Sequence, residues 1–347
     1  MESAIADARL LMIYFFLIQL TGCASWEGKF SGTKEANIGV FADQTIAIIA
    51  NSNLGLPIGN TVYVREFIEQ SDPEVQEFLK LEKELDRRLL RLIQYSITLV
   101  DIAEASKSEK EKVEKYASFL KSIQKSAEEN AGLAPGYYDN IIENIKEKKK
   151  FYEALQAAQP IINASGRGYQ ELLSNIEDSL KVLEVSLDHK IDERYATVIK
   201  YQQALEDEKY TILIALGQLY KFYKGDAEAF DKLRLSGALR QEGLLPKGTP
   251  SEKDLSNISD HLVKRLDITH KIWLEIEPDW KLYRATHQEL DELYVKMKTS
   301  LDRTRATVII WARAHQKMAA GITNPAEWFD INSAPAQLFK LGSNAIF

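Results

Sequence analysis

Cysteine is almost absent from this chain: Cys23 is the only one among 347 residues. One cysteine cannot form a disulfide within the chain, so an intramolecular disulfide is excluded. Small secreted domains often depend on disulfides, but a chain of this length can bury a core that is stable without them. The lack of disulfides is therefore compatible with export, and it leaves Cys23 as a residue that needs its own explanation.

Positive charge is also in deficit, with 44 Lys and Arg against 51 Asp and Glu and a formal net charge of -7. A protein that binds nucleic acid needs a basic surface to neutralise phosphates, so no nucleic acid partner is expected. The composition, 45% hydrophobic and 27% charged, is typical of a globular protein and excludes the disordered and collagen-like classes.

Long hydrophobic runs are missing as well. The most apolar stretch is LLMIYFFLIQL at residues 10–20, which is apolar except for Gln19. It is shorter than the ~20 residues that a membrane-spanning helix needs, and it is typical of the apolar region of a signal peptide. The stretch ends in Leu20-Thr21-Gly22-Cys23.

These four residues resemble the lipobox of bacterial lipoproteins, in which an aliphatic residue and two small residues precede a cysteine. The resemblance implies cleavage before Cys23, attachment of a diacylglycerol to its thiol, and often a further fatty acid such as palmitate on the new amino group. Several acyl chains give a stable anchor, because each buried methylene contributes ~0.8 kcal/mol and one chain binds only marginally. In lipoproteins, an Asp directly after the cysteine favours retention in the inner membrane. Residue 24 is Ala here, so the resemblance implies the periplasmic face of the outer membrane. The lipid bilayer, bound through acylated Cys23, is thus the one partner that the sequence indicates.

We expect four segments along the chain. Residues 1–22 form the signal peptide, and residues 23–37, rich in small and polar side chains, form a flexible tether. Residues 38–321 form a helical bundle domain, and residues 322–347, which lack periodicity, form an irregular tail.

The body has the apolar spacing of helices, three and four residues apart, and no long strand pattern. Expected boundaries include Pro73 in a first turn, stops at Gly225 and Gly321, and a capping box from Ser251 to Asp254. Interruptions are also predicted near Pro160 and at residues 166–168. The fold class is therefore all-α, an elongated antiparallel bundle of long, coiled-coil-like helices.

Residues with catalytic or metal-binding potential are few. Asp267 and His270 share a helix face at a spacing that a metal site could use, but no second such pair accompanies them. We interpret them as part of a solvated or salt-bridged face, and we expect no metal, no cofactor and no catalytic residue. His315, on an apolar stripe with Trp311, is interpreted as a core histidine.

Three functions are compared. We favour a non-enzymatic, membrane-anchored scaffold or interaction subunit of the cell envelope, whose protein partner the sequence does not name. The first alternative is a membrane-active protein that resembles helical pore-forming toxins and inserts the apolar residues 211–220, although a buried helix would have the same composition. The second is a metal-binding or enzymatic bundle that uses Asp267 and His270. Heptad stripes can pair between chains as well as within one, so homo-oligomers remain open.

Overall fold

The computed structural model describes residues 38–50, 61–131, 137–235, 239, 244, 246 and 248–322, with only the backbone described at 122–131 and 137. The predicted signal peptide, the tether with Cys23, and all of the predicted tail except Ile322 lie outside these ranges. Within them the regular structure is entirely helical, which confirms the all-α class. No helix in the described ranges combines the length and the apolar composition needed to cross a bilayer.

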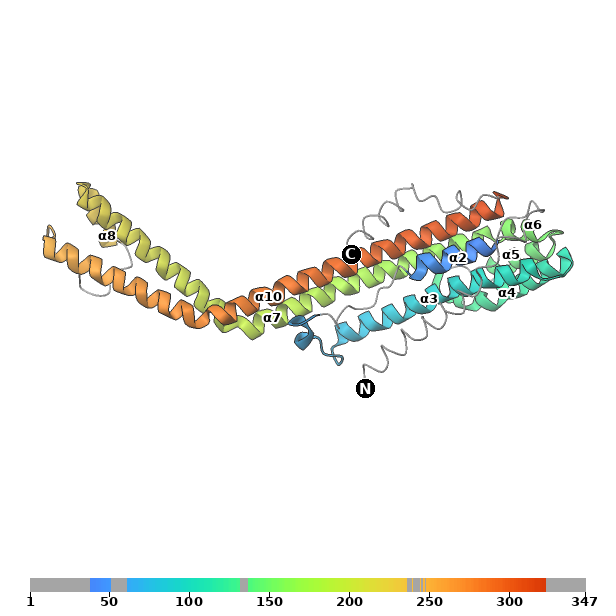
Figure 1. Cartoon of the computed structure of the whole chain (residues 1–347), viewed down its shortest axis with the longest axis horizontal. Coiled ribbons are helices and arrows are strands. Elements are labelled where there is room, and N and C mark those ends of the chain that lie inside the picture. The colour runs from blue at the N-terminus through green and yellow to red at the C-terminus, as the bar shows by residue number, and fades with distance from the viewer. Residues whose placement is uncertain are drawn as a thin grey trace, which may run out of the picture. The chain divides into compact units, whose positions relative to one another are not determined.

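The helices follow one another along the chain as labelled in Figure 1. They are α2 (Ile38–Ala50), a 3-10 turn (Val64–Phe67), α3 (Pro73–Glu104), α4 (Glu109–Ala131), α5 (Tyr137–Lys146), α6 (Phe151–Ala157), α7 (Gln159–Tyr223), α8 (Ala227–Leu235) and α10 (Glu252–Ala319).

Several helix boundaries lie where local chemistry predicts them. Pro73 opens α3, and the Ser251 hydroxyl donates to the Asp254 carboxylate at 2.6 Å while the Asp254 N–H donates back to Ser251 at 3.2 Å. After α7 and α10, Gly225 and Gly321 have positive φ angles of 97° and 80°. In each case the following N–H bonds the carbonyl five residues earlier, which is the geometry of a Schellman cap.

One predicted feature of the helices is wrong. Residues 166–168 do not interrupt a helix, because α7 continues through them. Residues 147–150 connect α5 to α6. There the N–H of Phe151 donates to the carboxylate of Glu109 at 2.8 Å, so a side chain from α4 caps the start of α6.

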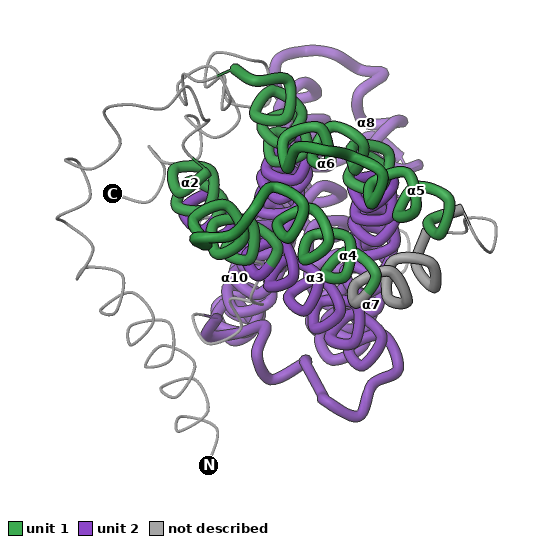
Figure 2. The backbone as a smooth tube through the Cα atoms, turned by 90° about the vertical axis from the view of Figure 1, so that its right-hand side faces the viewer, with its two compact units in different colours: residues 1–45, 95–163, 310–331 green, residues 46–94, 164–309, 332–347 purple. Residues whose placement is uncertain are grey.

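The chain divides into two compact units, drawn in green and purple in Figure 2. Unit 1 comprises residues 1–45, 95–163 and 310–331, and unit 2 comprises residues 46–94, 164–309 and 332–347. Several helices, including α3, α7 and α10, contribute residues to both units.

Unit 2 is built on α7 and α10, which lie side by side and antiparallel (Figure 1). Their polar contacts give the direction: Glu177 pairs with Arg305, Asp192 with Tyr283, and Glu208 with Arg265. The residue number falls along α10 as it rises along α7, so the predicted antiparallel packing is confirmed for this pair. The apolar stripe of α7 is buried at Leu173, Ile176, Leu180, Leu183, Leu187 and Ile191.

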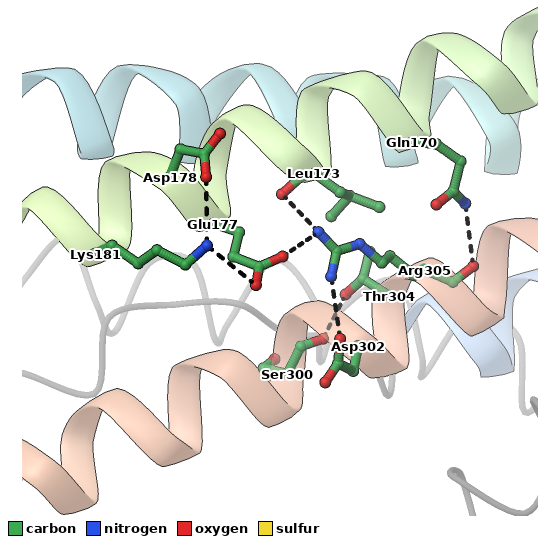
Figure 3. Close-up of polar contacts among 9 residues, drawn as sticks. All are labelled: Gln170, Leu173, Glu177, Asp178, Lys181, Ser300, Asp302, Thr304 and Arg305. Carbon is green, nitrogen blue, oxygen red and sulfur yellow. Dashed lines mark hydrogen bonds and ion pairs between the residues drawn. The ribbon is translucent and has the colours of Figure 1, made fainter.

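Among the residues in these contacts, Arg305 forms several polar interactions at once (Figure 3). Its guanidinium donates to the Glu177 carboxylate at 2.6 Å, to the Leu173 carbonyl at 3.3 Å and to Asp302 at 3.1 Å. The hydrogen bond from Arg305 is the main cause that lowers the pKa of Glu177. One planar guanidinium thus joins a carboxylate and a backbone carbonyl of α7 to its own helix.

At the other end of unit 2, the last turns of α7 pack with α8 and the first turns of α10. Their shared core contains the buried side chains Ile212, Ala215, Leu219, Phe230, Leu233, Leu239, Leu255, Ile258 and Leu262. The residues of α7 that face this core recur three and four positions apart, as expected for one side of a helix.

Unit 1 contains α4, α5 and α6 together with residues from α2, α3, α7 and α10. Its largest fully buried side chains are aromatic, namely Trp311, Tyr116, Tyr138 and Phe41. The predicted capping of α10 has a counterpart here: Ser108 and Glu111 form a capping box at the start of α4, with the Ser108 hydroxyl 2.8 Å from the Glu111 carboxylate.

Candidate functional site

Asp267 and His270, the metal ligands considered from the sequence, lie on α10 in unit 2. Asp267 is 2.7 Å from the Lys271 ammonium, and both side chains are more than half exposed. The predicted salt-bridged face is therefore observed for Asp267. Within the described residues, no group of three or more His, Cys, Asp and Glu side chains could hold a metal ion.

Both residues nevertheless line an open groove of about 670 Å³ between α7 and α10 in unit 2. Its apolar lining is Leu205, Val263, Leu266 and Trp273. Its charged lining adds Glu206 and Lys209 from α7. The volume is that of a small-molecule site, but Val263 is 54% exposed, so the groove is a surface feature rather than an enclosed pocket.

A buried polar cluster lies in the core of unit 1, around His315. Its Nε2 atom lies 2.7 Å from the Tyr95 hydroxyl, which lies 2.7 Å from the Tyr116 hydroxyl. Its Nδ1 atom lies 2.8 Å from the side-chain amide oxygen (Oε1) of Gln159. His315 and Tyr116 are completely buried and Tyr95 is 3% exposed. His315 is thus the core histidine that the sequence predicts.

The direction of each hydrogen bond follows from Gln159. Its amide nitrogen donates to Asn163 at 2.9 Å, so its oxygen faces His315 and accepts from Nδ1–H. A neutral imidazole with hydrogen on Nδ1 has a lone pair on Nε2, which therefore accepts from Tyr95. Tyr95 must in turn accept from Tyr116. The Tyr116 hydroxyl proton thus points toward Tyr95, and the Tyr95 hydroxyl proton points toward His315.

Burial sets the electrostatics of this cluster. It lowers the pKa of His315 to about 3 and raises the pKa values of Tyr95 and Tyr116 above the usual range. Burial penalises the charged form of each group, so all three stay neutral at neutral pH. A neutral network with its hydrogen bonds satisfied orders a core.

A second polar chain runs beside the first. Trp311 Nε1–H donates to the Ser96 hydroxyl at 3.4 Å, Ser96 donates to Thr45 at 3.2 Å, and Thr45 donates to the Phe41 carbonyl at 2.7 Å. The Trp311 ring centroid lies 5.7 Å from that of Tyr95 in an edge-on arrangement. The two chains together fix α2, α3 and α10 within unit 1.

Unit 2 holds a further histidine cluster that the sequence did not indicate. The two ring nitrogens of His287 lie 3.0 Å from Asp188 and 3.1 Å from Asp192. The Tyr283 hydroxyl donates to Asp192 at 3.0 Å. The pKa of Tyr283 is raised to about 12, mainly because of burial and secondly because of this hydrogen bond. The two aspartates belong to α7 and the other two residues to α10, so the cluster ties the helices together.

Glu289 makes an equally unexpected contact in unit 2. Its carboxylate accepts the N–H groups of Val62 at 2.7 Å, Tyr63 at 2.7 Å and Val64 at 2.8 Å. Burial raises the pKa of Glu289, but these three hydrogen bonds outweigh it and the net pKa is lowered. The carboxylate therefore fixes the backbone before the 3-10 turn.

The apolar residues 211–220 are not buried on all sides. Ile212 and Leu219 belong to the core of unit 2, but Leu213 is 49% exposed and Ile214 is 41% exposed. Tyr210 and Tyr220 on either side are 68% and 65% exposed. The interpretation of this segment as a core helix is correct for one face only. Its opposite face is a candidate interaction surface.

Comparisons with known proteins found no match: no protein family, no curated protein and no solved structure matches the chain.

Proposed function

We propose that this chain is a membrane-anchored lipoprotein of the cell envelope that acts as a non-enzymatic helical scaffold or interaction subunit. The lipobox residues Leu20-Thr21-Gly22-Cys23 support the anchor, and Ala24, which is not the Asp that favours inner-membrane retention in lipoproteins, supports the outer membrane as its location. The exposed apolar face around Ile214 carries the proposal of an interaction role, because solvent-facing Tyr, Leu and Ile side chains that gather on one helix mark contact surfaces.

The polar clusters of the two units support a structural role in the same way. The His315 network is buried beyond the reach of a substrate, and the Arg305, His287 and Glu289 contacts join helices or fix backbone. Each of these groups has its hydrogen-bonding capacity directed at the protein itself.

The test is a comparison of the intact protein with Cys23→Ala in cells. We expect the wild type in the membrane fraction with an acyl-modified Cys23 by mass spectrometry, and the variant in the soluble fraction. Pull-downs from envelope membranes with both proteins then identify partners that are lost with the anchor. An unmodified Cys23 in the wild type would refute the anchor.

The exposed side chains Leu213 and Ile214 also favour a second candidate, a helical protein that acts on membranes. Leakage of a dye from lipid vesicles distinguishes the two functions. A scaffold leaves the vesicles intact, whereas a membrane-active protein releases the dye and loses this activity in Leu213→Asp. Absence of leakage under acidic and neutral conditions excludes the second candidate.

A further inference from the structure

The exposed face of α7 has a regular pattern in its charges as well as in its apolar residues. Asp207, Tyr210, Ile214, Gly217 and Lys221 are all exposed and alternate three and four positions apart. We call these five residues the α7 seam. The spacing is that of a coiled-coil contact line, and it lies opposite the face that buries Ile212, Ala215 and Leu219 in unit 2.

The α7 seam is complementary to a second, antiparallel copy of itself. Asp207 and Lys221 stand at equal distances before and after Ile214, and Tyr210 and Gly217 stand at nearly equal distances inside them. If two copies of the helix pack antiparallel, Asp207 of each lies opposite Lys221 of the other, and Ile214 meets itself on a two-fold axis. Isologous contacts of this kind require a surface patch that is self-complementary.

The charged ends of the seam are available for such pairing. In the part of the chain that the structure describes, neither the Asp207 carboxylate nor the Lys221 ammonium forms an ion pair. Glu208, in contrast, is paired with Arg265 within unit 2.

Gly217 provides space for the largest side chain of the seam. A Cβ atom added at Gly217 would meet nothing within 4 Å. A glycine inside a helix costs about 1 kcal/mol relative to alanine, and among the described residues no neighbour requires it here. Across the two-fold axis, the absence of a side chain leaves room for the Tyr210 ring of the other copy.

We propose that the α7 seam binds the same seam of a second copy of this chain, as an antiparallel two-fold pair. The mirrored order of acid, aromatic, aliphatic, glycine and base favours this partner over a lipid surface, because Asp207 would oppose anionic lipid. The inference rests on the proposed interaction role, but its test does not use the anchor, so either can fail alone.

The pair is expected to be weak in solution and stronger on a membrane. The seam is about 21 Å long from Asp207 to Lys221 at 1.5 Å per residue, which is short for a stable coiled coil. Attachment of both copies to one bilayer raises their effective concentration, as for any tethered pair. A covalent trap therefore suits the experiment better than a binding isotherm.

The experiment places a cysteine on the axis, Ile214→Cys, in the full chain that also carries Cys23→Ser. A control cysteine replaces Val185, which is 68% exposed on α7 outside the seam. After oxidation, we expect at least about tenfold more disulfide-linked dimer from Ile214→Cys than from Val185→Cys, because the axis brings equal positions together. Equal yields, or no dimer from Ile214→Cys, would overturn the proposal.

Charge exchange tests the antiparallel register. Added to Ile214→Cys, Asp207→Lys should reduce the dimer yield about tenfold, since like charges then meet twice across the axis. Adding Lys221→Asp to the same chain should restore the yield. A double variant that stays as low as the single one contradicts the register.

Gly217→Glu separates pairing from folding. Because a Cβ atom at this position meets open space and glycine is the weaker helix former, we expect the helix content and the melting temperature to be retained or slightly raised, together with loss of cross-linking. If these seam variants leave cross-linking unchanged but lose binding to phosphatidylglycerol vesicles, the face binds lipid and the proposed pairing is wrong.

Discussion

The Nε2 atom of His315 lies 2.7 Å from the Tyr95 hydroxyl although 220 residues separate them in the sequence. The contact brings α3 and α10 together within unit 1, and it continues through Tyr116 on one side and Gln159 on the other. Tyr95 accepts a hydrogen bond from Tyr116 and donates one to His315, which donates in turn to Gln159, so removal of one member leaves its neighbours without a partner.

Tyr95→Phe should therefore destabilise unit 1. Phenylalanine retains the ring but leaves the Tyr116 hydroxyl without its acceptor and His315 without its donor. We expect the free energy of unfolding to fall by about 1–3 kcal/mol, the cost of leaving buried polar groups unpaired. Urea unfolding followed by circular dichroism measures this. Tyr152→Phe is the control, since Tyr152 is 40% exposed and should change stability by less than about 0.5 kcal/mol. Equal effects at both positions would contradict the prediction.

The stability of unit 1 should depend on pH through His315. Its pKa is about 3 in the folded protein and about 6.5 when unfolded, so only the unfolded chain binds this proton between those values. The contribution is complete above pH 6.5 and falls by about 1.4 kcal/mol per pH unit below it. Urea unfolding at pH 7, 6 and 5 should show this slope, and His315→Phe should reduce it. A variant with the wild-type slope argues against the assignment.

High pH should also destabilise the core of unit 1, through Tyr95 and Tyr116. The folded-state pKa values of Tyr95 and Tyr116 are raised, so the unfolded chain loses these protons first as the pH rises above about 10. Stability is complete below pH 10 and declines above it. Spectrophotometric titration of tyrosinate absorbance should reveal a fraction of tyrosines that ionise only on unfolding. Ionisation of all tyrosines near pH 10 in the folded protein excludes this.

Glu289→Gln should weaken the attachment of residues 62–64 in unit 2. The amide keeps one acceptor oxygen but loses the charge that strengthens all three backbone hydrogen bonds, at a cost of about 1–3 kcal/mol. Hydrogen exchange at the Tyr63 and Val64 amides should increase. Glu292→Gln is the matched control, because Glu292 is exposed on the same helix and contacts only the Gln288 side chain among the described residues. Unchanged exchange in Glu289→Gln would count against the role given to this carboxylate.

A double-mutant cycle should separate the Arg305–Glu177 pair from ordinary surface ion pairs. Both side chains are largely buried, and Arg305 also donates to the Leu173 carbonyl. We expect a coupling energy of about 1–2 kcal/mol for the alanine variants. The exposed pair Lys80–Glu77 on α3 serves as the reference and should give less than about 0.5 kcal/mol. Similar coupling energies in the two cycles would indicate that burial adds nothing at Arg305.

The features predictable from the sequence are those determined within a few residues. Ser251 and Asp254 are one turn apart, so their capping box can be read directly from the chain. Gly225 and Gly321 adopt positive φ angles that other residues resist, which makes them recognisable as helix ends. The apolar spacing likewise predicts the all-α class and the antiparallel pairing of α7 with α10.

The features that could not be predicted depend on distant residues. Residues 166–168 read as a break because glycine weakens a helix by about 1 kcal/mol. In the folded chain, Arg88 donates to the Gly168 carbonyl at 2.9 Å and Tyr169 donates to the Arg88 carbonyl, which helps α7 continue. The acceptors of Arg88, and the two partners of His315, follow from packing and leave no local pattern.

The exposed face of residues 211–220 was missed for a related reason. An apolar composition does not reveal whether one face or all faces of a helix are covered. Only the position of α8 and α10 on one side of α7 leaves Leu213 and Ile214 in solvent. For the candidate metal ligands Asp267 and His270, by contrast, the local sequence was sufficient. It predicted a salt-bridged helix face, and Asp267 pairs with Lys271 one turn away on the same helix.

His315 also gives the protein an internal spectroscopic marker. It is the only one of the five histidines that is buried, and its Nδ1 proton is held by Gln159 away from water. Such a proton exchanges slowly and gives its own low-field resonance in NMR spectra, where exposed imidazole protons are lost to exchange. The intensity of that single resonance would report the folded state of the unit 1 core without any added label.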